Sequence, residues 1–322
     1  MYLGIDLGGT NIAAGLVDDN CKIIRKNSVP AGRTRPFHEI VKDMIELSQK
    51  IIKEEGLEDS DVEKIGIASP GIANNEKGEI VYASSFPDFR NAPVAKEFKK
   101  YFPESEVYLE NDANAAAFGE MMAGAAKGKS NTVAVTLGTG VGGGIIIDKK
   151  IYAGFNNAGG EIGHKVIVCD GLECECGRRG CWEMYASGSA LIRQTREAAK
   201  ANPQSLINTI TNGALEKING KTVFDAADKG DITAKEVVDQ YIKYLSVGIV
   251  DIINVFRPEV IVIGGGISGQ GERLLSPIRE CAQKESYGQV DRETEIVAAA
   301  LGNDAGIIGA AMLWRQLEHD NW

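Results

Sequence analysis

The chain has 322 residues, of which 43% are hydrophobic and 25% are charged, as is typical of globular proteins. This length exceeds what one compact core usually supports, so it predicts two domains. The net charge of −10 argues against binding to a nucleic-acid backbone, for which a basic stripe is typical.

Strand and helix signals alternate throughout the chain, which indicates an α/β architecture. Residues 2–6 and 13–17 are apolar segments around a tight glycine turn and predict two strands. Apolar residues from Ile40 to Ile52 share one helical face, and Gly56 is a helix stop. The remaining predicted elements are buried strands at 64–68 and 106–110 and a helix at 113–126 with Asp112 in the N-cap position.

The second half repeats the opening pattern at larger scale. Strands predicted at 133–137 and 144–147 flank a glycine-rich turn, and Thr136-Leu-Gly-Thr-Gly140 echoes Asp6-Leu-Gly-Gly-Thr10. This echo indicates two related domains. The remaining predicted elements are a long helix at 233–256, a strand at 259–263 and an amphipathic last helix at 304–317.

No apolar run is long enough to cross a bilayer. The longest, from Val247 to Phe256, contains Asp251 and Asn254, whereas a span takes roughly 20 apolar residues. A strand is expected almost from Met1, so no signal peptide is predicted. Six cysteines without a secretion signal indicate reduced thiols. We therefore expect a cytoplasmic protein that contacts neither membranes nor nucleic acid.

Three glycine turns follow predicted strands, at Asp6–Thr10, Thr136–Gly144 and Gly264–Ser268. Such turns let backbone N–H groups approach phosphate oxygens, although many only reverse the chain. None ends as a Walker A loop does, and none has the acidic partner of a dinucleotide-binding fold. Asp6 lies at a strand end, where it either bonds the turn's own amides or holds Mg²⁺ beside the phosphates.

Glu110-Asn111-Asp112 ends the strand at 106–110 and leaves two interpretations of Asp112 open. The carboxylate either caps the following helix, or it takes the proton from an attacking hydroxyl in a phosphoryl transfer.

Four candidate metal ligands lie within eighteen residues, namely His164, Cys174, Cys176 and Cys181. Three cysteines and a histidine are a structural zinc composition that leaves no open coordination position. Gly177 and Gly180 supply the tight turns, and Cys169 is a weaker alternative ligand. The other interpretation is a redox-inert run of cysteines in a loop. Glu161 and Glu183 flank the cluster, either held rigidly for polyol hydroxyls or as solvated charges.

Seven motifs resemble those of the ROK family (repressors, open reading frames, kinases), most of all its bacterial glucokinases, over the whole chain. They are Asp6-Leu-Gly-Gly-Thr-Asn11, Glu110-Asn-Asp-Ala-Asn-Ala115, Leu137-Gly-Thr-Gly-Val-Gly-Gly143, Gly160-Glu-Ile-Gly-His164, Cys174-x-Cys-Gly-x-x-Gly-Cys-x-Glu183, Tyr185-Ala-Ser-Gly188 and Gly264-Gly-Gly-Ile267. The cysteine–glycine–glutamate block is the most specific of them.

The resemblance implies a two-domain actin-like fold (ribonuclease H-like, of the hexokinase type) with an active-site cleft between the domains. The small domain would comprise 1–112 plus 303–322, and the large domain 113–302 would carry the zinc loop and dimerise. The implied activity is ATP-dependent phosphorylation of a hexose, foremost glucose, at its 6-hydroxyl. The implied assembly is a homodimer or a dimer of dimers.

The resemblance also implies a role for each motif residue. Asp112 would be the general base. The sugar hydroxyls would be bound by Gly71, Ser85, Asn111, Asp112, Glu161, His164 and Glu183. ATP and Mg²⁺ would be bound by Asp6, Gly8, Gly9, Thr10, Asn11, Thr136, Gly138, Thr139, Gly140, Gly264, Gly265 and Gly266. Zn²⁺ would be bound by His164, Cys174, Cys176 and Cys181.

The chain departs from the family pattern in the loop that faces the sugar. Ala83-Ser-Ser-Phe-Pro-Asp-Phe89 stands where many glucokinases carry an Asn-Leu pair and a Trp, so the identity of the sugar stays open. N-acetylmannosamine kinases, fructokinases and allose kinases share the other motifs, and polyphosphate is an alternative donor.

Two further classes compete with a kinase. Sugar-responsive repressors of this fold carry a helix-turn-helix before the first glycine turn, which begins here at residue 6 and so argues against that role. An actin-like filament or chaperone ATPase would leave the cysteine cluster and Asn111-Asp112 without a purpose. A sugar sensor without catalysis is the remaining alternative.

Overall fold

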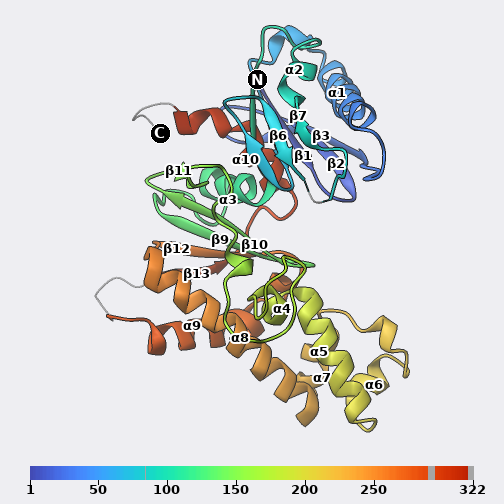
Figure 1. Cartoon of the computed structure of the whole chain (residues 1–322), viewed down its shortest axis with the longest axis vertical. Coiled ribbons are helices and arrows are strands. Elements are labelled where there is room, and N and C mark those ends of the chain that lie inside the picture. The colour runs from blue at the N-terminus through green and yellow to red at the C-terminus, as the bar shows by residue number, and fades with distance from the viewer. Residues whose placement is uncertain (84, 289–293, 318–322) are drawn as a thin grey trace. The chain divides into compact units, whose positions relative to one another are not determined.

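The computed structural model of the chain describes residues 1–83, 85–288 and 294–317 (Figure 1). It is a mixed α/β structure that divides into two compact units. The first unit comprises Met1–Ala134, Gly144–Gly160 and Ala300–Trp322, and the second comprises Val135–Gly143 and Glu161–Ala299. The expected domain boundaries at 112 and 303 stay a prediction.

The first unit contains a five-stranded sheet. In order across the sheet its strands are β3 (Ile23–Pro30), β2 (Asn11–Val17), β1 (Tyr2–Leu7), β4 (Lys64–Ser69) and β8 (Glu106–Asn111). β1 pairs antiparallel with β2 and parallel with β4, which in turn pairs parallel with β8. The carboxyl ends of β1, β4 and β8 therefore lie at one edge of the sheet, where both Asp6 and Asn111 are found. The strands predicted at these positions are confirmed.

Helices cover both faces of this sheet. Successive side chains of a strand point to opposite faces, so each strand contributes residues to the packing on both sides. Leu3 and Ile5 point to one face, where they share a buried core with residues of α1 (Phe37–Glu54) such as Ile40. Gly4 lies on the other face, where a Cβ would stand 2.0 Å from the carbonyl oxygen of Ile307 in α10 (Asp304–Ala311). The absence of a side chain thus allows α10 to pack directly on the strand.

The last helix differs from the amphipathic helix that was predicted at 304–317. α10 ends at Ala311 and is buried along nearly its whole length, and a separate 3₁₀ turn, η5 (Leu313–Leu317), follows it. α10 packs against β1 on one side and against α3 (Asp112–Ala123) on the other, so it has no solvent face to make polar. Gly309 permits the second contact, because a Cβ there would lie 1.7 Å from the carbonyl oxygen of Ala115.

The first unit also contains smaller elements. They are the 3₁₀ turn η1 (Asp59–Asp61), the helix α2 (Val94–Phe98) and a three-stranded sheet of β5 (Ile72–Asn74), β6 (Glu79–Tyr82) and β7 (Arg90–Ala92).

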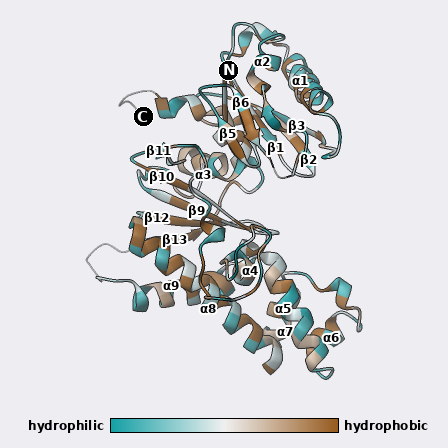
Figure 2. Ribbon diagram, viewed as in Figure 1, coloured by the Kyte–Doolittle hydropathy of each residue, from teal (hydrophilic) through white to brown (hydrophobic). Residues whose placement is uncertain are grey.

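A second five-stranded sheet follows the predicted repeat. Its strands, in order, are β11 (Lys150–Ile151), β10 (Val141–Ile147), β9 (Thr132–Leu137), β12 (Val260–Gly264) and β13 (Glu295–Ala298). β9 and β10 are neighbours joined by a glycine turn, as β1 and β2 are in the first sheet, which confirms the repeated strand–turn–strand. Figure 2 shows β9, β12 and β13 in the colours of apolar residues, as expected of strands in a core.

The helices of the second unit gather around α8 (Ile232–Phe256), the long helix that the sequence predicted. α8 ends at Phe256, and its C-cap, Arg257, is left-handed (φ 46°) and precedes Pro258. It packs against α4 (Glu183–Ala186), α5 (Gly188–Ala201), α7 (Thr222–Asp228) and α9 (Glu272–Glu285). The shorter elements are η2 (Ile162–His164), α6 (Leu206–Ile210), η3 (Leu215–Lys217) and η4 (Gly266–Gln270).

Long apolar helices are missing from the described ranges: none of the helices there has both the length and the hydropathy that a membrane span requires.

Candidate functional site

Carboxylates gather at the carboxyl edge of the first sheet. Asp6 pairs in register with Ala68, and Ala68 pairs with Glu110, so these strand ends are level with one another. Burial, together with the negative charge of Asp112, raises the pKa of Asp6 to about 7. α10 approaches Asp6 at Gly306, where a Cβ would stand 2.4 Å from Asp6 Oδ2. The structure therefore brings Asp6 and Asp112 to one place.

Asn111, and not Asp112, is the N-cap of α3, which corrects the sequence-based expectation. Asn111 Oδ1 accepts the N–H groups of Ala113 and Asn114 at 2.9 and 3.2 Å. Asp112 is the first residue of the helix, and its Oδ1 accepts the N–H of Ala113 at 2.8 Å. Both residues are good capping types, so the sequence could not separate two adjacent candidates. Because Asn111 caps the helix, helix capping does not explain the presence of an aspartate at position 112.

Burial raises the pKa of Asp112, although the backbone N–H of Ala113 opposes part of this rise. A carboxylate with a raised pKa is a stronger base at neutral pH.

Glu110 has no role predicted from the sequence, yet it supports this region. Burial raises its pKa, and its Oε1 accepts the N–H of Asn111 at 2.8 Å and the Nδ2 of Asn114 at 3.0 Å.

Asn111 also reaches the predicted sugar residue Gly71. Its Nδ2 donates to the carbonyl oxygen of Gly71 at 2.9 Å. Gly71 has a φ of +90°, and a Cβ there would lie 2.0 Å from the carbonyl oxygen of Tyr82, so only glycine fits. Ser85 is half-buried, while Ser84 lies outside the described residues.

The first glycine turn joins β1 to β2 and borders a cavity. Gly8 donates its N–H to the carbonyl oxygen of Asn11 at 2.9 Å, and Thr10 is exposed. The cavity has a volume of about 620 Å³. Its lining consists of Asp6, Gly8, Gly9, Thr10, Asn11, Ala13, Lys26, Asn27, Ser28, Asn303, Asp304 and Ile307. Five of the predicted nucleotide residues thus line one hollow.

The other two glycine turns contact each other within the second unit. Gly265 has a φ of +83°, and a Cβ there would stand 2.5 Å from the carbonyl oxygen of Leu137. Gly188, which opens α5, donates its N–H to the carbonyl oxygen of Gly138 at 2.8 Å. The structure therefore unites Thr136–Gly140 with Gly264–Gly266. Gly188 belongs to the motif Tyr185-Ala-Ser-Gly188, but the spacing of the motifs does not predict its hydrogen bond to Gly138.

The four predicted metal ligands converge in the second unit. The ligand atoms of His164, Cys174, Cys176 and Cys181 all lie within 4.8 Å of one another. Cys176 Sγ is 3.6 Å from Cys181 Sγ, and Cys174 Sγ is 3.6 Å from His164 Nδ1. A tetrahedral zinc with bonds of about 2.3 Å holds its sulfurs roughly 3.8 Å apart, whereas a disulfide needs about 2.05 Å. The donor set therefore fits zinc in both chemistry and spacing.

Glycines fold the cysteine loop back on itself. Gly177 and Gly180 have φ values of +86° and +81°, and Gly177 donates its N–H to the carbonyl oxygen of Cys174 at 2.9 Å. A Cβ on Gly180 would lie 1.7 Å from the carbonyl oxygen of Val168. Cys169, the alternative ligand, is exposed and is not among the clustered ligands.

Glu183 links the cysteine cluster to the second glycine turn. Its Oε1 is 3.0 Å from Cys174 Sγ and 3.3 Å from His164 Nδ1. A Cβ on Gly140 would stand 2.6 Å from Glu183 Oε2. Glu161, in contrast, is exposed and precedes η2, whose residue His164 donates its N–H to the carbonyl oxygen of Glu161 at 3.1 Å.

Comparison with known proteins agrees with these motifs. The model of the ROK family matches residues 2–317. A glucokinase from Thermotoga maritima is 37% identical over 318 residues, covering 98% of this chain and 97% of the relative. The structure of a ROK family glucokinase from Streptomyces griseus, in complex with glucose and AMPPNP, has a TM-score of 0.80 at 36% identity and covers 98% and 99% of the two chains. A xylose repressor from Bacillus spizizenii is 30% identical, covering 97% of this chain and 76% of the repressor.

Proposed function

The chain belongs to the ROK family, and we propose that it is an ATP-dependent glucokinase that forms glucose 6-phosphate. The proposal rests on glucokinase relatives that match nearly its full length, and on the two-domain actin-like fold that it shares with structures of ROK glucokinases.

The observation that carries the mechanism is the position of Asp112. Asn111 caps α3, and burial raises the pKa of the neighbouring Asp112. We propose that the Asp112 carboxylate takes the proton of the sugar's 6-hydroxyl as the hydroxyl oxygen attacks the γ-phosphorus. The bond from the γ-phosphorus to the bridging oxygen breaks, and ADP leaves with the electron pair.

We assign the remaining sugar hydroxyls to the residues that the family motifs imply. These residues are Gly71, Ser85, Asn111, Glu161, His164 and Glu183. Support comes from the hydrogen bond of Asn111 to Gly71, and from the contact of Glu183 with His164. Each fixes a polar group in one orientation, as recognition of a polyol requires.

The nucleotide is assigned to the glycine turns. Gly8, Gly9, Thr10, Asn11, Thr136, Gly138, Thr139 and Gly140 would bind the phosphates, while Gly264, Gly265 and Gly266 would lie against the adenosine. Backbone N–H groups at such turns bind anions without a basic side chain. Mg²⁺ would accompany ATP and offset phosphate charge, and we assign the Asp6 carboxylate to it.

His164, Cys174, Cys176 and Cys181 would hold a structural Zn²⁺. Four protein ligands close the coordination sphere, so the ion would fix the loop and take no part in the chemical step. Zinc-binding thiols must stay reduced, which supports a cytoplasmic location.

We also propose that the protein is a homodimer or a dimer of dimers. Light scattering of the purified protein tests this oligomeric state.

The test of the function is a coupled assay of ADP release with Asp112→Asn. Asparagine keeps the oxygen that accepts the Ala113 N–H but is no base, so we expect kcat to fall by a factor of about 10²–10⁴. Asp239→Asn, on the exposed surface of α8, is the matched control and should leave kcat unchanged. Turnover of Asp112→Asn within tenfold of the wild type would refute the assignment of the base.

The same assay with several sugars tests the substrate. We expect glucose to give the highest kcat/KM among glucose, mannose, fructose, allose and N-acetylmannosamine. A different best sugar would leave the mechanism intact and make the loop at 83–89 the specificity determinant. Turnover with none of them would favour a sugar sensor.

A further inference from the structure

The third glycine turn is anchored firmly at its beginning. Ser268 Oγ donates to the carbonyl oxygen of Gly265 at 2.8 Å, which closes the turn. Ile267 lies against two glycines: a Cβ on Gly220 would stand 2.4 Å from Ile267 Cδ1, and a Cβ on Gly188 would stand 3.3 Å from Ile267 Cγ1. Packing therefore fixes η4 at Ile267, and the other end of this turn is Gln270.

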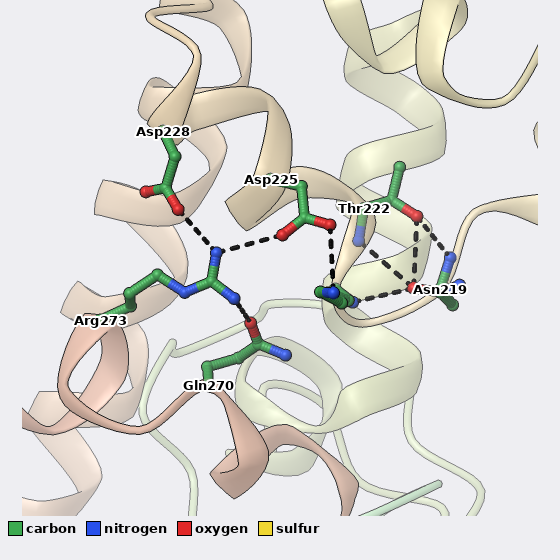
Figure 3. Close-up of polar contacts among 7 residues, drawn as sticks. Asn219, Thr222, Asp225, Asp228, Gln270 and Arg273 are labelled. Carbon is green, nitrogen blue, oxygen red and sulfur yellow. Dashed lines mark hydrogen bonds and ion pairs between the residues drawn. The ribbon is translucent and has the colours of Figure 1, made fainter.

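A guanidinium fixes that end. Arg273 Nη2, at the beginning of α9, donates to Gln270 Oε1 at 2.7 Å. Its Nη1 donates to Asp228 Oδ2 at 2.7 Å and to Asp225 Oδ1 at 3.1 Å, both on α7. Figure 3 shows the guanidinium between these three acceptors. Arg273 thus ties the end of η4 to a helix that lies some 45 residues earlier in the chain.

α7 presents these carboxylates from a fixed position. Asn219 Oδ1 accepts the N–H groups of Lys221 and Thr222 at 2.9 and 3.3 Å, which holds the start of the helix (Figure 3). The guanidinium of Arg273 also lies 5.6 Å from the centre of the Phe224 ring, within the range of a cation–π contact. The planar fork of arginine meets all of these partners at once, which the single ammonium of lysine does not.

We propose that Arg273 is a positioning residue for the adenosine end of the nucleotide site. By holding Gln270 against α7, it keeps η4, and with it Gly264–Gly266, in the conformation that receives the nucleoside. This inference rests on the proposed kinase function. It predicts an effect on ATP alone, because the network contacts neither Asp112 nor any predicted sugar residue.

The contribution of the network to the stability of the whole fold is expected to be small. The side chains of Arg273 and Asp225 are 32% and 34% exposed, and ion pairs at this exposure stabilise proteins little. Variants of the network should therefore fold, and changes in their kinetics should report on the site.

The experiment measures kcat, KM for ATP and KM for glucose in three variants of the network and in one control variant. Arg273→Ala should raise KM for ATP about fivefold to tenfold, with kcat and KM for glucose within twofold of the wild type. Gln270→Ala leaves both ion pairs in place and cuts only the link to η4, so it should reproduce most of the rise. Arg273→Lys should fall between the wild type and Arg273→Ala. Lys235→Ala breaks an exposed ion pair with Asp239 on α8 and is the matched control.

The outcomes separate this inference from the proposed function. A wild-type protein that phosphorylates no sugar would contradict the function. An active wild type whose KM for ATP is unchanged in both Arg273→Ala and Gln270→Ala would overturn the inference. Equal rises in KM for ATP and for glucose would also overturn it, because they would indicate a general loss of structure. Calorimetric titration with AMPPNP, with glucose present, should show the same weakening as KM for ATP.

Discussion

Asp6→Asn should stabilise the unliganded protein while lowering its activity. The wild-type Asp6 has a pKa of about 7 in the fold, against its usual value of 3.8, because burial and the charge of Asp112 disfavour its ionised form. Between these two values the folded protein holds a proton that the unfolded chain has lost. Its stability therefore falls as the pH rises through this range.

The size of the effect follows from the two pKa values. Each pKa unit corresponds to about 1.4 kcal/mol, so the raised pKa of Asp6 costs the fold roughly 4 kcal/mol above pH 7, where the buried group is ionised, and roughly 1.5 kcal/mol at pH 5, where the group must take up a proton. Asparagine carries no charge at either pH. The stability gained by Asp6→Asn should therefore be about 2.5 kcal/mol larger at pH 8 than at pH 5, whatever the pH-independent effect of the substitution.

Urea denaturation of wild type and variant at both pH values measures this difference, with neither Mg²⁺ nor nucleotide present. Asp239→Asn, at an exposed aspartate on α8, is the matched control, and the change in stability that it gives is the baseline for Asp6→Asn. A gain from Asp6→Asn that stays constant between pH 5 and pH 8 would refute the reasoning. The kinase activity of the same variant should fall at least tenfold if Asp6 holds Mg²⁺.

Two further predictions concern the metal cluster and a buried carboxylate. Metal analysis should find about one zinc per chain, and Cys176→Ser should lose zinc and lower the Tm; protein free of zinc would contradict the cluster's assignment. Glu120→Ala should destabilise the fold by about 3 kcal/mol, because the buried carboxylate accepts the N–H groups of Ala125, Ala300 and Leu301 at 2.8–3.0 Å. A loss below about 1 kcal/mol in urea denaturation would contradict this.

The spacing of apolar residues in the sequence is sufficient to predict helices that bury only one face. α1 carries its apolar residues on a single stripe, and α8 ends where Arg257-Pro258 predicted. The amphipathic pattern expected for α10 is wrong because the burial of this helix depends on β1 and α3, both of which lie far from it in the sequence. No local pattern shows that a helix will be enclosed on both sides.

For a similar reason, the sequence predicts some parts of the candidate site and not others. Four candidate metal ligands within eighteen residues can be recognised from their residue types and spacing, and the structure brings them together. The N-cap was misplaced by one position, since only the backbone conformation separates Asn111 from Asp112. Arg273 was missed because it is one charged residue among many, and its partner Asp225 lies 48 residues away in the chain.

Identification of the product tests the central claim most directly. The purified protein is mixed with glucose, ATP and Mg²⁺, and the reaction is followed by ³¹P NMR. The account predicts that glucose 6-phosphate and ADP appear in equal amounts, and that neither forms when glucose is omitted. Release of inorganic phosphate without a phosphorylated sugar would contradict it, because the protein would then be an ATPase and not a sugar kinase.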